Sequence, residues 1–111
     1  MNVGAIDIGT NSVRLLITDA SGHELAREMS ITRLGQGVDV TGSLHPDAIA
    51  RTTEVLSSYR VLLVKHQVAR VRATATSAAR DATNSAAFFD AAEHALGHRP
   101  PGEPYLQQTQ H

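Results

Sequence analysis

Short apolar runs separated by polar, glycine-containing turns dominate the N-terminal part of the chain. Residues 3–8 form such a run and carry Asp7 near its end, residues 13–18 form a second, and residues 25–34 form a third. Apolar runs of this length bounded by turn residues are typical of β-strands. We therefore expect a hairpin over 3–18 followed by a third strand over 25–34.

Beyond residue 45 the apolar spacing changes to that of a helix. Pro46 and Asp47 are typical of a first helical turn. Asp47 and Arg51 are four residues apart, which predicts an ion pair on the exposed side. The expected buried stripe recurs every three or four residues and consists of Ile49, Thr52, Leu56, Tyr59 and Leu63.

Apolar and polar residues then alternate with a period of two, and after this segment the apolar residues return to helical spacing. Residues 68–76 predict a fourth strand, in which Val71, Ala73 and Ala75 alternate with Arg70, Arg72 and Thr74. Asn84 or Ser85 is suited to cap a second helix, and Gly97 is suited to end it. The inward side of this helix is expected to carry Phe88, Phe89, Ala92 and Leu96.

The expected order β-β-β-α-β-α predicts an α/β fold. Strands joined by short turns form an antiparallel meander, and a helix then crosses over to a strand parallel to one of them. We expect a mixed sheet with helices packed against it over residues 1–97. The remaining residues, 98–111, contain three of the four prolines and no apolar periodicity, so we expect an unstructured tail.

Composition narrows the functional classes. A chain of 111 residues suits one domain, and 41% hydrophobic with 19% charged residues is typical of a globular protein. The absence of cysteine excludes disulfides, Cys-zinc sites and thiol catalysis. A net charge of −1 argues against nucleic-acid binding. No apolar run reaches the ~20 residues that span a bilayer, so we expect no membrane association and a cytoplasmic location.

The first candidate site follows the first strand. Asp7 lies at the strand end, where its carboxylate could hold Mg²⁺, and Arg14 lies on the second strand at the same end. The turn between them offers amides and hydroxyls to phosphate oxygens through Gly9, Thr10, Asn11 and Ser12. On residue types alone, an ordinary hairpin turn that satisfies its own backbone is an equal alternative.

The second candidate site follows the fourth strand and leads to a helix, the place where open α/β sheets bind ligands. Thr76 and Ser77 could donate to an anion there, and Arg80 could neutralise a phosphate. The alternative is a capping turn with a surface pair between Arg80 and Asp81. The glycine-rich loop over 35–42 does not fit a dinucleotide site, because Val40 stands where a third glycine is needed.

Three segments together resemble the exopolyphosphatase/guanosine pentaphosphate phosphohydrolase (Ppx/GppA) family. They read AIDIGTNSVRLLI at 5–17, ITRLGQGVDVTGSL at 31–44 and ATSAARDATN at 75–84. The resemblance covers about residues 3–97. It implies the ribonuclease-H-like fold of the superfamily that includes actin, sugar kinases and heat-shock chaperones.

The resemblance also implies roles for the candidate residues. Residues 9–12 would be the first phosphate-binding loop, Asp7 would lie near Mg²⁺ and the attacking water, and Arg80 would reach the phosphate chain. Arg14 would be a second anion contact, while Thr76 and Ser77 would line the same cleft. The implied reaction removes the terminal phosphate of inorganic polyphosphate or guanosine pentaphosphate. A homodimer of the full-length enzyme is implied as well.

Other segments of the family pattern do not occur in this sequence. They are an SGxEEA-type segment with the glutamate that activates water, a DxGGGS-type second phosphate loop and the second lobe. We therefore expect a truncated, N-terminal part of such an enzyme. The alternatives are a non-catalytic phosphate-binding fragment and a kinase of the same superfamily.

Overall fold

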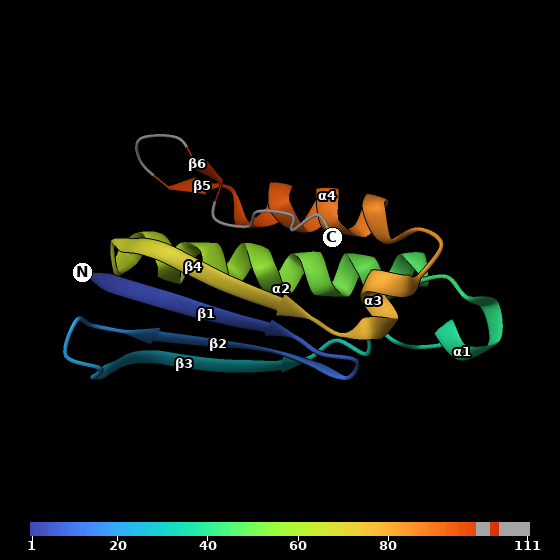
Figure 1. The fold of residues 1–111 in the computed structure, drawn as a ribbon, viewed down its shortest axis with the longest axis horizontal. Coiled ribbons are helices and arrows are strands. Elements are labelled where there is room, and N and C mark those ends of the chain that lie inside the picture. The colour runs from blue at the N-terminus through green and yellow to red at the C-terminus, as the bar shows by residue number, and fades with distance from the viewer. Residues whose placement is uncertain (100–102, 105–111) are drawn as a thin grey trace.

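The computed structural model of the protein describes residues 1–99 and 103–104 (Figure 1). The elements are β1 (Asn2–Ile8), β2 (Ser12–Thr18), β3 (Glu24–Ile31), α1 (Val38–Thr41), α2 (Pro46–Lys65), β4 (Val68–Ala75), α3 (Ser77–Asp81), α4 (Ser85–Leu96), β5 (His98–Arg99) and β6 (Glu103–Pro104). The expected order of three strands, a helix, a strand and a helix is confirmed. The short helices α1 and α3 are additions, formed where the sequence predicted a loop and a turn.

The four long strands form one mixed sheet in the order β3-β2-β1-β4. β1 pairs antiparallel with β2, and β2 pairs antiparallel with β3, which confirms the predicted meander. β4 pairs parallel with β1, so the carboxyl ends of these two strands lie side by side. In this register Asp7 is opposite Arg14 on one side and Thr74 on the other.

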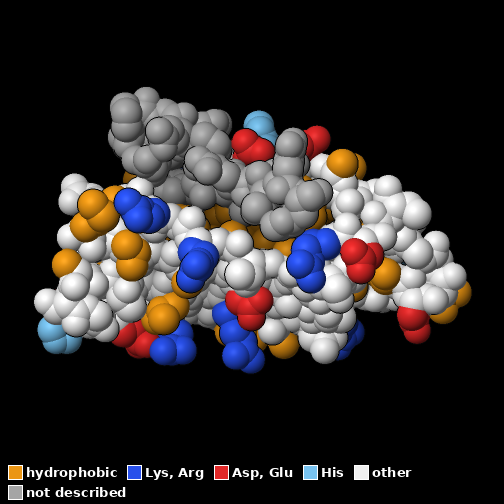
Figure 2. Space-filling view, viewed as in Figure 1, with side chains coloured by type: hydrophobic (Ala, Val, Ile, Leu, Met, Phe, Trp, Pro, Cys, Tyr) orange, Lys and Arg blue, Asp and Glu red, His pale blue; other side chains and the backbone are white. Residues whose placement is uncertain are grey.

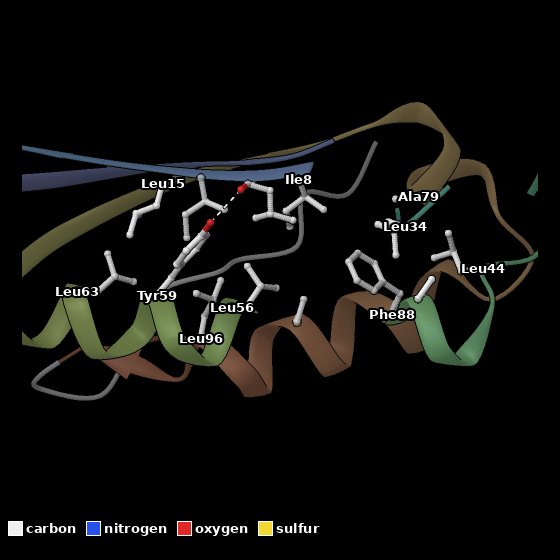
Figure 3. Packing of buried hydrophobic residues seen from close by; sticks show 14 of the residues in the cluster. Ile8, Leu15, Leu34, Leu44, Leu56, Tyr59, Leu63, Ala79, Phe88 and Leu96 are labelled. Carbon is white, nitrogen blue, oxygen red and sulfur yellow. Dashed lines mark hydrogen bonds between the residues drawn. The ribbon is translucent and has the colours of Figure 1, made fainter. Parts of the chain in front are cut away.

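Helices α2 and α4 lie on one side of the sheet, and the core fills the space between them and the strands (Figure 3). Alternate residues of β1 and β2 point into this space, while the residues between them lie on the opposite face. The largest fully buried hydrophobic side chains are Ile6, Ile8, Leu15, Ile17, Leu34, Leu44, Leu56, Leu63, Phe88 and Leu96. No helix in the described part of the chain is long and apolar enough to cross a membrane.

The third strand is shorter than predicted. It ends at Ile31 rather than at residue 34, because the N–H groups of Thr32 and Arg33 both donate to the carbonyl oxygen of Asn11, at 3.0 and 3.1 Å. Leu34 then turns into the core and is fully buried, whereas Ile31 is 60% exposed. The chain therefore leaves the sheet to run against the turn between β1 and β2.

The start of α2 agrees with the prediction, but its exposed side does not. Thr52, Leu56, Tyr59 and Leu63 are buried as expected, and Ala48 is buried in place of Ile49, which is only half-buried. The predicted pair between Asp47 and Arg51 is wrong. Arg51 instead donates from Nε to the carbonyl oxygen of Thr32 at 3.0 Å and from Nη2 to Oε1 of Gln36 at 2.9 Å.

Helix α4 ends at Gly97 as predicted, but the expected side-chain cap at its start is absent. Asn84 precedes the helix without capping it, because its side-chain amide forms two hydrogen bonds with the backbone of Leu44. The Leu44 N–H donates to Oδ1 at 2.8 Å and Nδ2 donates to the Leu44 carbonyl at 2.9 Å. Asn84 therefore joins two distant segments of the chain.

The predicted unstructured tail lies mostly outside the described residues. Of the segment 98–111, the structure describes His98–Arg99 and Glu103–Pro104, which pair as an antiparallel ladder. The prediction for the remaining residues of the tail stays a prediction.

Tyr59 connects α2 to the sheet by a hydrogen bond within the core (Figure 3). Its hydroxyl donates to the carbonyl oxygen of Val13 at 2.8 Å. Burial raises the pKa of the Tyr59 phenol above its ordinary value of 10.0. Because the folded state favours the protonated phenol, the stability linked to this group is present below pH 10 and is lost as the pH rises through the raised pKa.

We expect Tyr59→Phe to lower the free energy of unfolding by about 1–2 kcal/mol at neutral pH, because the Val13 carbonyl loses its buried donor. Urea denaturation followed by circular dichroism measures the loss. The difference between the two proteins should narrow above pH 10, where the wild-type phenol ionises. Equal stability at neutral pH would show that the hydrogen bond contributes nothing.

Candidate functional site

The turn over residues 9–12 is closed tightly on itself. The Gly9 N–H donates to the Ser12 carbonyl oxygen at 2.9 Å. A Cβ atom at position 9 would lie 2.9 Å from that same oxygen, closer than real Cβ contacts allow. The close approach of two backbone segments therefore requires glycine at this position.

This turn presents unused hydrogen-bond donors. Thr10 and Asn11 are exposed, and within the described residues their N–H groups donate to no protein acceptor. The carbonyls of Thr10 and Asn11 accept from Gly35, Thr32 and Arg33 on one side of the turn. Because C=O and N–H point in opposite directions across a planar trans peptide, the N–H groups of Asn11 and Ser12 are directed away from those partners. Adjacent backbone N–H groups in a turn are suited to bind an anion.

The structure brings the two predicted site segments together at the carboxyl end of the sheet. The Thr10 and Thr76 hydroxyl oxygens are 2.9 Å apart and share a hydrogen bond, and the Thr76 N–H donates to the Ile8 carbonyl at 2.9 Å. Ser77 is the next residue and begins α3. The parallel pairing of β1 and β4 explains this meeting, since it places the two strand ends side by side.

Arg80 lies in the last turn of α3 and is exposed. The alternative surface pair between Arg80 and Asp81 does not form among the described residues, which give Arg80 no ion-pair partner within 4.0 Å. No hydrogen bond or ion pair among the described residues joins the Arg80 side chain to the 9–12 turn. Its connection to the turn is through Thr76, which precedes the helix and accepts from the Arg80 N–H at 3.1 Å.

Asp7 and Arg14 lie on the face of the sheet opposite α2. Thr74 Oγ1 is 3.4 Å from Asp7 Oδ1, and Arg14 is the cross-strand neighbour of Asp7. A hollow of about 400 Å³ opens on this face. The side chains that line it include Asp7, Arg14, Leu16, Arg27, Met29, Arg72 and Thr74.

The residues that line this hollow suit Mg²⁺ only in the binding mode in which one carboxylate holds the ion together with substrate phosphates and water. Within the described part of the chain no group of three acidic or histidine side chains could enclose a metal ion. Asp7 is a single exposed carboxylate, and Mg²⁺ is commonly bound by one or two carboxylates together with substrate phosphates and water. The site therefore suits a metal that arrives with a phosphate substrate.

Sequence reasoning missed the segment that supports the 9–12 turn. The Gly35 N–H donates to the Thr10 carbonyl at 3.0 Å, and a Cβ atom at position 35 would lie only 2.4 Å from Thr10 Cγ2. The available signal is the glycine-rich stretch over 35–42, which does not fit a dinucleotide site but contains the glycine that touches Thr10.

The same segment also contacts the third region of resemblance. The Thr83 N–H donates to the Gly42 carbonyl at 2.9 Å, the hydroxyls of Ser43 and Thr83 form a hydrogen bond, and Asn84 binds Leu44. Figure 1 shows the 9–12 turn, α1 and α3 gathered at one end of the sheet. All three segments that carry the resemblance thus meet at the same place.

Basic side chains are spread along the face shown in Figure 2 rather than gathered in one dense patch. This face therefore has no strongly basic patch of the kind that attracts polyanions over a distance.

Comparisons with known proteins agree on one family. The sequence model of the Ppx/GppA phosphatase family matches residues 16–99. Exopolyphosphatase 2 of Mycobacterium tuberculosis is 50% identical over 107 residues, which cover 90% of this chain and 34% of that protein. A guanosine-5'-triphosphate,3'-diphosphate pyrophosphatase of Vibrio cholerae is 33% identical over 97 residues, which cover 85% of this chain and 20% of that protein.

The fold is similar to solved structures of the same family. The crystal structure of the Aquifex aeolicus Ppx/GppA family member superposes with a TM-score of 0.82 at 38% identity, covering 89% of this chain and 33% of that chain. The ribonuclease-H-like α/β fold implied by the resemblance agrees with this match. The chain spans about a third of the length of that structure and of the mycobacterial relative.

We expect Gly9→Ala to open the turn, because the new methyl group meets a backbone oxygen that cannot move aside. The cost should be about 1–3 kcal/mol in the free energy of unfolding. Amide chemical shifts of Thr10 and Asn11 should change most, and Ser21→Ala in an exposed turn is the control. Unchanged shifts at Thr10 and Asn11 would contradict the steric argument.

Proposed function

Because this chain belongs to the Ppx/GppA phosphatase family, we propose that it forms part of an exopolyphosphatase. The 9–12 turn binds phosphate groups of the substrate, and the reaction removes the terminal phosphate of inorganic polyphosphate or guanosine pentaphosphate. The names of the mycobacterial and Vibrio relatives support these two substrate classes. A cytoplasmic location and a homodimer of the full-length enzyme belong to the same proposal.

The observation that carries the proposal is the pair of unused N–H groups at Thr10 and Asn11, on a turn closed by the hydrogen bond from Gly9 to Ser12. The hydroxyl of Thr10 also ties this turn to the hydroxyl of Thr76. Phosphoryl transfer needs little covalent help from a protein. It needs substrate oxygens held in position and their negative charge balanced. A fixed turn with free donors supplies the first of these requirements.

The remaining site residues take the roles that the resemblance implies. Arg80 and Arg14 contact phosphate oxygens, and Thr76 and Ser77 line the cleft beside the 9–12 turn. Asp7 orients the attacking water and holds Mg²⁺, which supplies charge balance for the phosphate oxygens when it is bound. The general base that activates the water is not assigned to any residue of this sequence.

A second candidate function is non-catalytic phosphate binding. It is favoured by the unused backbone donors of the 9–12 turn, which are sufficient to bind an anion without further chemistry. Both candidates require the same phosphate-binding turn. They differ only in whether phosphate is released.

Phosphate release from polyphosphate with Mg²⁺, in the absence of any acceptor sugar, separates the candidates. We expect release by the polypeptide that carries this chain together with the remaining segments of the family. The isolated chain should bind tripolyphosphate without turnover, seen as chemical shift changes at Thr10 and Asn11. Transfer that depends on an acceptor would show a kinase instead, and no binding by either protein would overturn the proposal.

We expect Arg80→Ala to lower turnover by about 100-fold or more in the active polypeptide, because a fixed cation on the transferring phosphate stabilises the transition state. Arg80→Lys should recover only part of the loss, since an ammonium cannot form the two parallel bonds of a guanidinium. Steady-state phosphate release measures both variants.

The matched control is Arg70→Ala, an exposed arginine on β4 that pairs with Val3, well before the carboxyl end of the strand. Turnover should stay close to wild type in this variant. Equal losses at Arg70 and Arg80, or none at Arg80, would show that Arg80 is only a surface residue.

A further inference from the structure

Arg51 is a half-buried arginine of α2 that binds no carboxylate among the described residues. Its Nε donates to the Thr32 carbonyl at 3.0 Å, and its Nη2 donates to Gln36 Oε1 at 2.9 Å. A guanidinium can reach two separate acceptors in this way because its donors form a rigid planar fork. Both acceptors belong to the segment over 32–36.

The Thr32 carbonyl is one half of a peptide unit whose other half contacts the phosphate-binding turn. This unit joins the Thr32 carbonyl to the Arg33 N–H, and that N–H donates to the Asn11 carbonyl at 3.1 Å. Since C=O and N–H point in opposite directions across a planar peptide, one rigid unit lies between Arg51 and Asn11. A rotation of that unit would break both hydrogen bonds at once.

The next peptide unit extends the connection into the turn. The Asn11 carbonyl accepts from both Thr32 and Arg33, which directs the Ser12 N–H to the other side of the turn. The Gly35 N–H fixes the Thr10 carbonyl in the same manner and so directs the Asn11 N–H. The orientation of the Asn11 and Ser12 N–H groups therefore depends on where the 32–36 segment lies. The Thr10 N–H belongs to the preceding peptide unit, which this segment does not bind.

The backbone of that segment needs an external restraint. Arg33 has φ of 52°, in the left-handed region that is unfavourable for a residue other than glycine. The Gln36 N–H closes the turn by donating to the Arg33 carbonyl at 3.1 Å. Arg51 binds the carbonyl of Thr32, just before this turn, and the side chain of Gln36, the last residue of the turn.

We infer that Arg51 is a positioning residue for the phosphate-binding turn, acting through the 32–33 peptide unit rather than through contact with the substrate. The inference rests on the proposed function of the 9–12 turn. It assigns to Arg51 a part in phosphate affinity, although this side chain lies on a helix and binds none of residues 9–12 directly.

The test compares Arg51→Met with Arg51→Lys in the 111-residue chain. Tripolyphosphate with Mg²⁺ is the probe, titration calorimetry measures its Kd, and amide hydrogen exchange reports on Thr32, Arg33 and Gly35. We expect Arg51→Met to weaken binding about tenfold and to accelerate exchange at Thr32 and Arg33 by a similar factor, since hydrogen bonds from a charged donor are lost. Arg51→Lys should restore part of the affinity through a single bond to the Thr32 carbonyl.

Two controls on α2 separate positioning from charge and from stability. Arg60→Ala removes an exposed arginine about 13 Å further along the helix, and it should leave Kd within about twofold. Leu62→Ala shortens a half-buried core side chain and should lower Tm without changing Kd. Tm is measured for every variant, so that variants of equal stability are compared.

Unchanged Kd in Arg51→Met, or an equal loss of affinity in Leu62→Ala at matched Tm, would overturn the inference. A wild-type chain that binds no tripolyphosphate would overturn the proposed function and, with it, the role of Arg51 in affinity. In that case, accelerated exchange at Thr32 and Arg33 in Arg51→Met would still show the link between α2 and the turn. The two failures are therefore distinguishable.

Discussion

The burial of a single face of the sheet by α2 is the constraint on which the rest of the structure depends. Because side chains alternate along a strand, placing Ile6 and Ile8 in the core directs Asp7 to the opposite face. The parallel pairing of β1 with β4 then sets Thr74 beside Asp7 and brings the ends of both strands together. The polar side chains at these positions are therefore not buried in the core. They lie on the face of the sheet opposite α2 and at the carboxyl ends of β1 and β4.

That end of the sheet is assembled mainly by backbone contacts between distant segments. Gly9 and Gly35 are required where a Cβ atom would meet Ser12 or Thr10, and neither requirement involves a positive φ angle. The hydrogen bonds from 32–35 to the carbonyls of the 9–12 turn use main-chain groups on both sides. Such contacts constrain the sequence mainly at the few positions where the backbone segments touch.

Hydrophobic periodicity was sufficient to predict the four strands of the mixed sheet and both long helices, since each buries one face with a regular spacing. It did not predict the two-residue strands β5 and β6. It was insufficient for α1 and α3, which are too short for a periodic pattern to develop. The partners of Arg51 and Asn84 could not be predicted by local rules either. Both side chains bind backbone groups at least 19 residues away, and the expected local partners at Asp47 and at the start of α4 are not used.

Holding a phosphate and hydrolysing it make different physical demands, and the described residues meet them unequally. Holding requires oriented donors, which Thr10 and Asn11 provide on a turn restrained by Thr76 and the 32–36 segment. Hydrolysis further requires a water activated in line with the bond that breaks. Asp7 is exposed and belongs to no group of three acidic or histidine side chains among the described residues, so it suits a metal ion that is bound together with substrate oxygens and water. In the proposed function, phosphate affinity and turnover therefore depend on different groups, and affinity is the property assigned to this turn.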